Sequence, residues 1–125
     1  MIIICLHIDE SYQKMVDEIK EYITGNFHKQ ITLNDLSGKY YLSSSYLSKI
    51  FKEATGVNFT KYLYTYRINQ AKELLQHSGD RPIREICSSV GFNDVCYFYR
   101  VFRKAEGTTP TDYKLRMKRG RQVGK

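Results

Sequence analysis

The chain carries the same helical pattern twice, fifty residues apart. The first copy is ITLNDLSGKYYLSSSYLSKIFKEATGVNFTKYL, residues 31–63, and the second is RPIREICSSVGFNDVCYFYRVFRKAEGTTPTDYK, residues 81–114. With one extra residue in the second turn, the copies agree at Leu33/Ile83, Leu36/Ile86, Tyr40/Val90, Leu42/Phe92, Tyr46/Tyr97, Leu47/Phe98, Lys49/Arg100, Ile50/Val101, Phe51/Phe102, Lys52/Arg103, Gly56/Gly107 and Tyr62/Tyr113. A short helix, a tight turn and a second helix with basic residues, used twice, predict two equivalent contacts with double-stranded DNA.

Helical spacing and capping residues predict an all-α fold of about seven helices, since no stretch alternates well enough for a sheet. Predicted helix starts are marked by Thr32, Ser43, Asn58, Pro82, Asp94 and Thr109, and predicted ends by Gly25 with Asn26, Gly56 and Gly107. The helix from Asn58 to about His77 is roughly 27 Å long at 1.5 Å per residue, which predicts a rigid spacer. The last helix is expected to end near Lys118.

These elements define the expected organisation of the chain. The predicted segments are an N-terminal tail or remnant of an upstream segment (1–11), a first helix-turn-helix subdomain (12–57), a linker helix (58–77), a second subdomain (78–118) and a basic tail (119–125). The predicted apolar sides of the first and the long helix are Met15, Val16, Ile19, Tyr22 and Ile23, and Phe59, Tyr62, Leu63, Tyr66, Ala71, Leu74 and Leu75. The positions predicted to be buried on the two candidate recognition helices are Leu47, Ile50, Phe51 and Ala54, and Phe98, Val101, Phe102 and Ala105.

Charge is distributed unevenly along the chain, whose formal net charge is +7. Residues 1–30 hold three lysines and five acids, whereas the residues from Arg100 onward hold nine basic and two acidic side chains. A strongly basic end is typical of a nucleic-acid-binding protein, although a merely basic surface has the same composition.

Other classes of function find little support in the sequence. The cysteines Cys5, Cys87 and Cys96 and the three histidines lack the spacing of a metal site, so no metal or cofactor is expected. No acid/base pair, activated nucleophile or phosphate loop indicates an enzyme, and no catalytic residue is predicted. The opening MIIICLHI is too short for a membrane span and lacks the basic start of a signal peptide, which favours a cytoplasmic protein with no membrane partner. A strand, a dimer contact and a remnant of an upstream domain remain open for these residues.

The candidate DNA contacts lie on the second helix of each copy, where the apolar stripe leaves one face free. The candidates for base contact are Ser44, Ser45, Ser48 and Lys49 in the first copy and Val95, Cys96, Tyr99 and Arg100 in the second. Lysine and arginine donate to guanine, serine donates or accepts, and valine or cysteine can contact a thymine methyl group. Lys52, Arg103 and Lys104 lie about one turn further along, which favours contact with phosphates.

Each of these assignments has a structural alternative. The serines suit an ordinary first helical turn, Lys49 and Arg100 suit a solvated surface, and Cys96 suits packing. Tyr46 and Tyr97 are expected to pack or to contact phosphate, and Arg67 is expected to be a structural or surface charge.

The chain resembles the DNA-binding domain of the AraC/XylS family of bacterial transcription regulators from about Met15 to Lys118. The resemblance is carried by RINQAKELL with IREICSSVGFNDVCYFYRVFRKAEGTTPTDYK, and YLSSSYLSKIFKEATGVNFTKYL also resembles output domains of response regulators. It implies two helix-turn-helix subdomains whose recognition helices are 44–55 and 95–106. It further implies transcription activation with RNA polymerase as a partner, in the bacterial cytoplasm at the nucleoid. Val95 and Cys96 depart from the polar residues of many members.

The sequence therefore predicts a sequence-specific DNA-binding transcription regulator whose recognition helices enter successive major grooves. One chain supplies both helices, so the oligomeric state stays open. No receiver or effector-binding domain is recognisable before the helices; control is expected through abundance if the chain is complete, or through a missing domain if it is a fragment. The alternative function is a protein-interaction module that binds an acidic partner such as RNA polymerase or a sensor protein.

Overall fold

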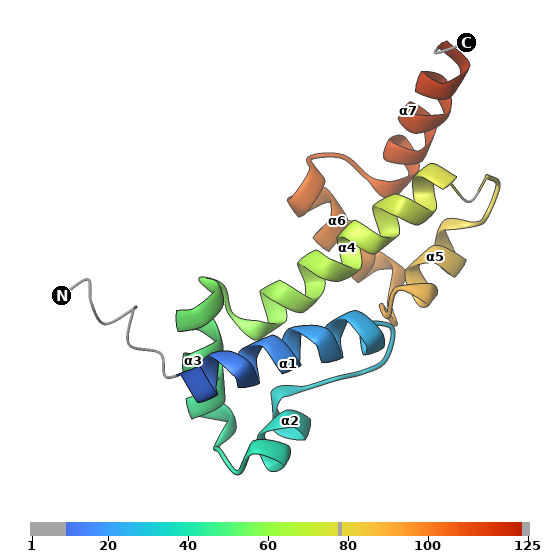
Figure 1. Cartoon of the computed structure of the whole chain (residues 1–125). Coiled ribbons are helices and arrows are strands. Elements are labelled where there is room, and N and C mark those ends of the chain that lie inside the picture. Colours follow the sequence, from blue (N-terminus) through green and yellow to red (C-terminus); the bar gives the residue numbers. More distant parts are fainter. Residues whose placement is uncertain (1–9, 78, 124–125) are drawn as a thin grey trace. The chain divides into compact units, whose positions relative to one another are not determined.

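The computed structural model describes residues 10–77 and 79–123, and in that part of the chain it contains seven helices and no strand (Figure 1). The helices are α1 (Glu10–Asn26), α2 (Leu33–Tyr40), α3 (Ser44–Thr55), α4 (Phe59–His77), α5 (Ile83–Ser89), α6 (Val95–Glu106) and α7 (Pro110–Val123). The predicted all-α class is confirmed. Among these described helices, none has both the length and the apolar character that crossing a bilayer requires.

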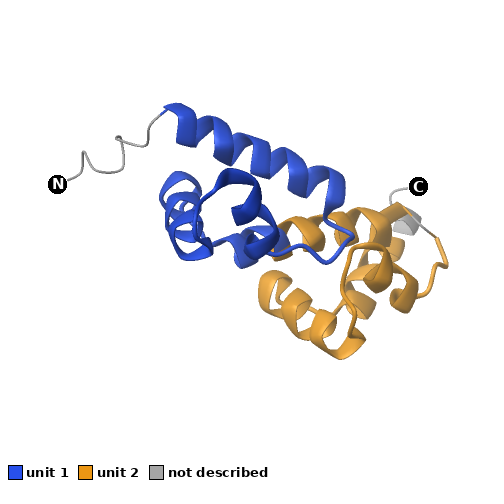
Figure 2. Cartoon of the chain, turned by 90° about the horizontal axis from the view of Figure 1, so that it is seen from below, with its two compact units in different colours: residues 1–63 blue, residues 64–125 orange. Residues whose placement is uncertain are grey.

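The chain divides into two compact units, residues 1–63 and residues 64–125 (Figure 2). The division falls inside α4, between Leu63 and Tyr64. The start of α4 therefore belongs to unit 1 with α1, α2 and α3, and the rest of α4 belongs to unit 2 with α5, α6 and α7. The helix that the sequence sets apart as a linker thus supplies packing surface to both units.

The core of unit 1 forms where α1 and α3 pack together. Val16, Ile19 and Ile23 of α1 are fully buried, as are Leu47 and Phe51 of α3. The Phe51 ring also meets the rings of Phe59 and Tyr62 at the start of α4, with centroid distances of 5.7 and 5.3 Å. Full burial of such apolar side chains contributes about 1.5–3 kcal/mol each, so these contacts fix the buried side of α3.

The core of unit 2 is built on aromatic side chains of α6. Phe98 and Phe102 are fully buried, and their ring centroids are 5.8 Å apart. Phe98 also meets Phe92 in the turn before α6, at 5.2 Å, and Phe102 meets Tyr113 of α7, at 5.5 Å. These ring contacts hold one side of α6 inward, which leaves the other side at the surface.

The predicted caps begin and end the helices as expected. Thr32 and Asp35 form a capping box at α2, and Ser43 accepts a hydrogen bond from the Tyr46 N–H at the start of α3. The side chains that cap the next helices are Asn58, which accepts from the Lys61 N–H, Asp94, which accepts from the N–H groups of Cys96 and Tyr97, and Thr109, which accepts from the Asp112 N–H. Gly56 and Gly107 follow α3 and α6 with φ angles of 85° and 78°, a left-handed conformation that favours glycine.

One packing prediction for α6 is wrong, and the structure decides between the two alternatives given for Arg67 on α4. Ala105 was expected in the core but is exposed. The residue one turn after Phe102 is instead Glu106, whose carboxylate lies 3.1 Å from the ammonium of Lys72 on α4 and occupies that side of the helix. Arg67 is not a surface charge, because only 4% of it is exposed.

Helix α7 also differs from the sequence prediction. The helix continues to Val123, whereas the sequence predicted an end near Lys118 and a basic tail from residue 119. Gly120 lies within this helix. An interior glycine costs about 1 kcal/mol relative to alanine, which is too little by itself to end a helix. Residues 1–8, for which the sequence left a strand, a dimer contact and a remnant of an upstream domain open, lie outside the described residues.

The turn between α2 and α3 predicts a stabilising substitution. Tyr41 has φ 55° and ψ 35°, a left-handed conformation, and its side chain is 95% exposed. Gly91 occupies the matching turn of unit 2 with φ 102°. A non-glycine residue is strained by roughly 1–2 kcal/mol in this conformation, and glycine removes that strain. Because glycine also loses more chain entropy on folding, Tyr41→Gly should raise the free energy of unfolding by only up to about 1 kcal/mol. Urea denaturation measures this change, and a decrease in that free energy would contradict the argument.

Candidate nucleic-acid interface

The free side of α3 brings together most of the base-contact candidates of unit 1. Ser45, Lys49 and Lys52 are exposed and Ser48 is half-buried, on the side of the helix away from the core. We call Ser45, Ser48, Lys49 and Lys52 the recognition face of α3. Their spacing of three and four residues places them along one side of the helix.

Helix α6 presents a matching surface in unit 2. Cys96, Arg100 and Arg103 are exposed and Tyr99 is half-buried. These four residues, the recognition face of α6, have the same spacing as those of α3. Lys104 is exposed beside them, whereas Val95 is half-buried at the start of the helix.

Two candidates are held by neighbouring elements of their own unit. The Ser44 hydroxyl donates to the Asn34 Oδ1 of α2 at 2.7 Å, and the Tyr99 hydroxyl shares a hydrogen bond of 2.6 Å with the Thr111 hydroxyl of α7. Neither contact was predicted, since the partners lie 10 and 12 residues apart, beyond the reach of helical periodicity. Both hydroxyls are therefore less free for a base edge than the serine and arginine side chains beside them.

The electrostatic character of α6 is set by three exposed cations and one tethered carboxylate. Arg100, Arg103 and Lys104 are exposed, and the one acidic residue of α6, Glu106, is paired with Lys72. The negative charge within the helix is thus partly neutralised on the side that faces α4. The exposed face keeps the positive charge that attracts phosphates.

Arg100 is not fully solvated, because its guanidinium carbon lies 5.4 Å from the centroid of the Tyr97 ring. Such a cation–π contact contributes about 0.5–1 kcal/mol at an exposed site. Tyr97 was predicted to pack or to touch phosphate, and its role as a partner of Arg100 has no signal in the sequence beyond the three-residue spacing.

The recognition faces have the chemistry of a groove-binding surface. Lysine and arginine donate to guanine or phosphate, serine hydroxyls donate or accept, and the Cys96 side chain is small enough to approach a thymine methyl group. Each face lies on a 12-residue helix with a side-chain N-cap and a glycine after its end. The side chains are therefore carried on rigid elements rather than on loops.

The described residues show no alternative centre of metal chemistry, and the buried thiol is poorly suited to nucleophilic chemistry. Across residues 10–77 and 79–123, no three His, Cys, Asp or Glu side chains gather closely enough to hold a metal ion. Cys87 is buried, and burial together with the charge of Asp94 raises the pKa of its thiol. A raised pKa keeps this thiol protonated near neutral pH.

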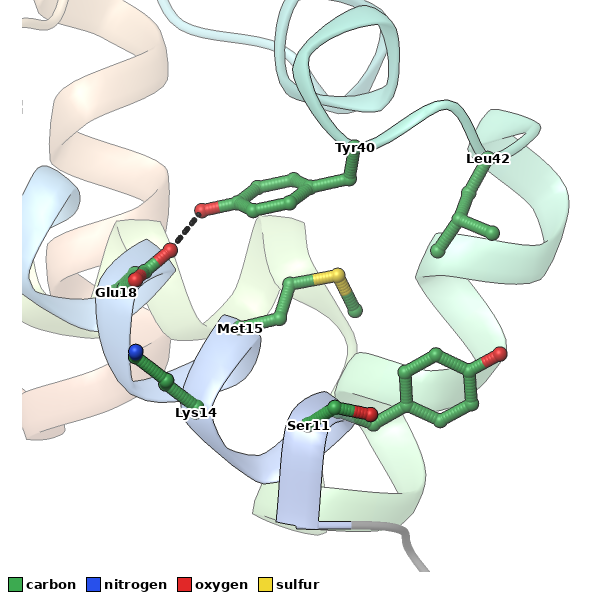
Figure 3. Close-up of a pocket in the computed structure, with 7 residues that line it drawn as sticks. Ser11, Lys14, Met15, Glu18, Tyr40 and Leu42 are labelled. Carbon is green, nitrogen blue, oxygen red and sulfur yellow. Dashed lines mark hydrogen bonds between the residues drawn. The ribbon is translucent and has the colours of Figure 1, made fainter.

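A pocket of about 280 Å³ lies on unit 1 (Figure 3), and none of its lining residues belongs to the recognition face of α3. Its lining residues are Ser11, Tyr12, Lys14, Met15, Glu18, Tyr40 and Leu42. The Tyr40 hydroxyl reaches across it and donates a 2.9 Å hydrogen bond to the Glu18 carboxylate. This bond joins α2 to α1 and so supports the helix that precedes the turn into α3.

The Tyr40–Glu18 bond predicts a loss of stability at high pH. Burial, the hydrogen bond and the charge of Glu18 raise the pKa of Tyr40 to about 12, from 10.0 in a free side chain. Because the folded state holds this proton more tightly, the stabilisation is complete below about pH 10 and declines as the pH rises through about 12. Tyr40→Phe should lower the free energy of unfolding by about 0.5–1 kcal/mol at pH 7, a small effect because the bond is exposed.

The measurement for this prediction is urea denaturation of wild type and Tyr40→Phe between pH 7 and pH 12. The difference in the free energy of unfolding between the two proteins is free of the titration of the other tyrosines, which both proteins share. This difference should shrink above pH 10. A difference that stays constant across this range would show that Tyr40 titrates normally.

Comparisons with known proteins give a consistent set of matches. A family model described as a helix-turn-helix domain matches residues 36–116. The HTH-type transcriptional regulator YtdP of Bacillus subtilis is 31% identical over 106 residues, which cover 85% of this chain and 14% of that protein. The regulatory protein PocR of Salmonella typhimurium is 37% identical over 93 residues, which cover 74% of this chain and 30% of that protein. The chain thus spans less than a third of either relative.

Solved structures include domains with the same fold. The C-terminal domain of the two-component response regulator yesN from Fusobacterium nucleatum is 39% identical, with a TM-score of 0.74 over 78% of this chain and 95% of that domain. The C-terminal domain of the response regulator AraT from Geobacillus stearothermophilus is 34% identical, with a TM-score of 0.75 over 80% of this chain and 83% of that chain. The DNA-binding domain of AdpA, solved with a target DNA, has a TM-score of 0.79 over 86% of this chain and 96% of that domain, and at 24% identity it supports the fold alone.

Proposed function

Because the chain belongs to the AraC-type helix-turn-helix family of transcription regulators, we propose that it binds a specific double-stranded DNA sequence and regulates transcription there. The observation that carries this proposal is the pair of matched recognition faces. Lys49 and Lys52 on α3 correspond to Arg100 and Arg103 on α6, and all four side chains are exposed. A folded scaffold that presents the same basic spacing twice suits contact with a repeating, negatively charged helix.

Base recognition is assigned to residues in the first half of each recognition helix. On α6, Arg100 offers the planar donor pair that fits guanine O6 and N7, with Cys96 one turn earlier. On α3, Ser45 and Ser48 have short side chains, so the helix must come close to the base edges for them to make contact. Lys49 can donate a hydrogen bond but lacks the planar donor pair of an arginine. The two helices should therefore prefer different base sequences.

Phosphate contact is assigned to Lys52 on α3 and to Arg103 and Lys104 on α6. These residues lie in the last turns of their helices and are exposed. Contacts with phosphate add affinity and fix register, but they carry little sequence information. Each such contact should add about 0.9 to the negative slope of log affinity against log salt concentration.

The bound arrangement and the regulatory outcome complete the proposal. The two recognition helices enter successive major grooves of one duplex, so a single chain occupies two adjacent half-sites. Activation, with RNA polymerase as a protein partner, is the outcome that membership of this family favours. These relatives are much longer than the segment they share with this chain, and a further domain in such a protein can control a module of this kind.

The decisive experiment is selection of bound duplexes from a random pool, followed by titration of the selected duplex at two salt concentrations. The proposal predicts two enriched blocks about ten base pairs apart, unlike each other in sequence, and a steep decrease of affinity with salt. Enrichment of a single block would contradict the use of both helices. The absence of any preference over random competitor would favour a module that binds an acidic protein instead.

A further inference from the structure

A continuous series of aromatic and guanidinium groups in unit 2 leads from the core to Arg100. Arg67 on α4 is 4% exposed, and its guanidinium carbon lies 5.8 Å from the centroid of the Tyr64 ring and 5.6 Å from that of Phe92. Tyr64 and Phe92 both contact the ring of Tyr97, at centroid distances of 5.9 and 6.4 Å. Arg100 ends the series 5.4 Å from the centroid of the same Tyr97 ring.

The contacts of Tyr97 fix the orientation of its ring. Tyr64 meets it at an interplanar angle of 74°, and burial together with the neighbouring Tyr97 hydroxyl raises the pKa of Tyr64. Phe92 lies against Tyr97 at 59° and is itself packed on Phe98. Because 37% of Tyr97 remains exposed, the ring is anchored from inside while part of it reaches the surface, where Arg100 lies.

We propose that Tyr97 is a positioning residue, which holds the guanidinium of Arg100 in place on α6 before DNA binds and thereby sharpens the base preference of this helix. The inference rests on the proposed function, since it requires that Arg100 donates to a base edge. A flexible arginine loses rotamer freedom when it is fixed on binding, and a side chain that is already ordered loses less. A guanidinium that contacts a ring through its face keeps its in-plane N–H groups for guanine O6 and N7.

The equivalent position in unit 1 provides a matched control. Tyr46 corresponds to Tyr97 in the repeat, but its ring packs edge-on against Tyr12 of α1, with centroids 6.2 Å apart. The residue that corresponds to Arg100 is Lys49, whose ammonium has no planar fork to orient. Removing the Tyr46 ring therefore tests the loss of a surface aromatic from a recognition helix without the loss of an arginine platform.

The experiment measures the affinities of wild type, Tyr97→Leu, Tyr97→Phe and Tyr46→Leu for the selected duplex and for duplexes with each base pair of the α6 block changed. Tyr97→Leu should reduce the discrimination at one base pair by about two- to fivefold, the equivalent of an exposed cation–π contact. Tyr97→Phe keeps the ring face and should stay within about twofold of wild type. Tyr46→Leu should leave discrimination in the α6 block unchanged.

Three results would overturn the positioning role. Unchanged discrimination in Tyr97→Leu is the first, and an equal loss of affinity for every duplex, as from a purely structural defect, is the second. The third is a loss of discrimination in Tyr97→Phe as large as that in Tyr97→Leu. Because Tyr97→Phe retains the ring and its core contacts, it still tests the role if Tyr97→Leu unfolds.

A measurement without DNA separates this inference from the proposed function. The ring current of Tyr97 should shift the NMR signals of the Arg100 side-chain protons, and Tyr97→Leu should move them to the values of a solvated arginine while Tyr97→Phe should not. If these signals are unaffected by the leucine substitution, the positioning role fails whatever the DNA data show. If they move as expected but wild type selects no DNA sequence, the proposed function fails and the role in base preference fails with it.

Discussion

Phe98→Ala should lower the free energy of unfolding by about 3–5 kcal/mol, the range expected when a large aromatic side chain is removed from a core. Phe98 is fully buried, and its ring lies 5.2 Å from that of Phe92 and 5.8 Å from that of Phe102. Alanine leaves a cavity among aromatic rings that are also packed on other elements, so the surroundings can close it only in part. For a domain whose total stability is about 5–15 kcal/mol, such a loss is a large fraction.

Urea denaturation followed by far-ultraviolet circular dichroism measures this effect, and hydrogen exchange locates it. Amide protection should fall in α5, α6 and α7, which lie wholly in unit 2, because Phe98 contributes to that core. Leu115→Ala is the control, since this leucine of α7 is 48% exposed and should change stability by less than about 1 kcal/mol. Equal effects of the two substitutions would show that α6 is not held by its aromatic side.

Local signals in the sequence were sufficient for the helices and for most of their ends, although not for the end of α7. Capping depends on a side chain and an N–H group two or three residues away, so Ser43 and Asp94 could be recognised without a structure. The same holds for Gly56 and Gly107, because a left-handed residue after a helix requires little more than its own backbone freedom. The repeat then strengthened each assignment, since the same signals occur in both copies.

Contacts between distant residues account for what the sequence could not predict. The bond of Tyr99 with Thr111 and the ion pair of Lys72 with Glu106 join residues on different helices. Periodicity assigns a residue to one side of its own helix, but it does not identify the neighbour on that side. For this reason Ala105 was wrongly placed in the core, and the sequence could not decide whether Arg67 was a structural or a surface charge.

The two units share a scaffold but differ on the recognition faces, which bears directly on the expected DNA target. Leu47 and Phe51 match Phe98 and Phe102 as core residues, so the same positions of the repeat form the core in both units. On the recognition faces the corresponding residues differ: Ser45 and Ser48 of α3 correspond to Cys96 and Tyr99 of α6, and Lys49 corresponds to Arg100. A protein with unlike faces should bind a directional sequence rather than a palindrome.

Arg100→Ala should reduce affinity for the selected duplex by about 1–3 kcal/mol and relax the preference at one base pair. The reason is the loss of a bidentate donor, which discriminates between bases as well as adding charge. Random duplex should be affected much less, because only the phosphate attraction of one cation is lost there. The measurement is a titration of wild type and variant on the selected duplex, on its single-base-pair variants and on random duplex at one salt concentration.

Arg103→Ala and Lys52→Ala are the controls, because each removes one exposed cation from a recognition helix at a position assigned to phosphate. Both should weaken binding to all duplexes alike and reduce the salt slope by about 0.9, without a change of sequence preference. Arg103 is the closer match, since it lies on α6 three residues from Arg100 and has the same side chain. If Arg100→Ala lowers affinity for selected and random duplexes equally, as these controls should, then Arg100 contacts phosphate and the base preference of α6 must come from Cys96 and its neighbours.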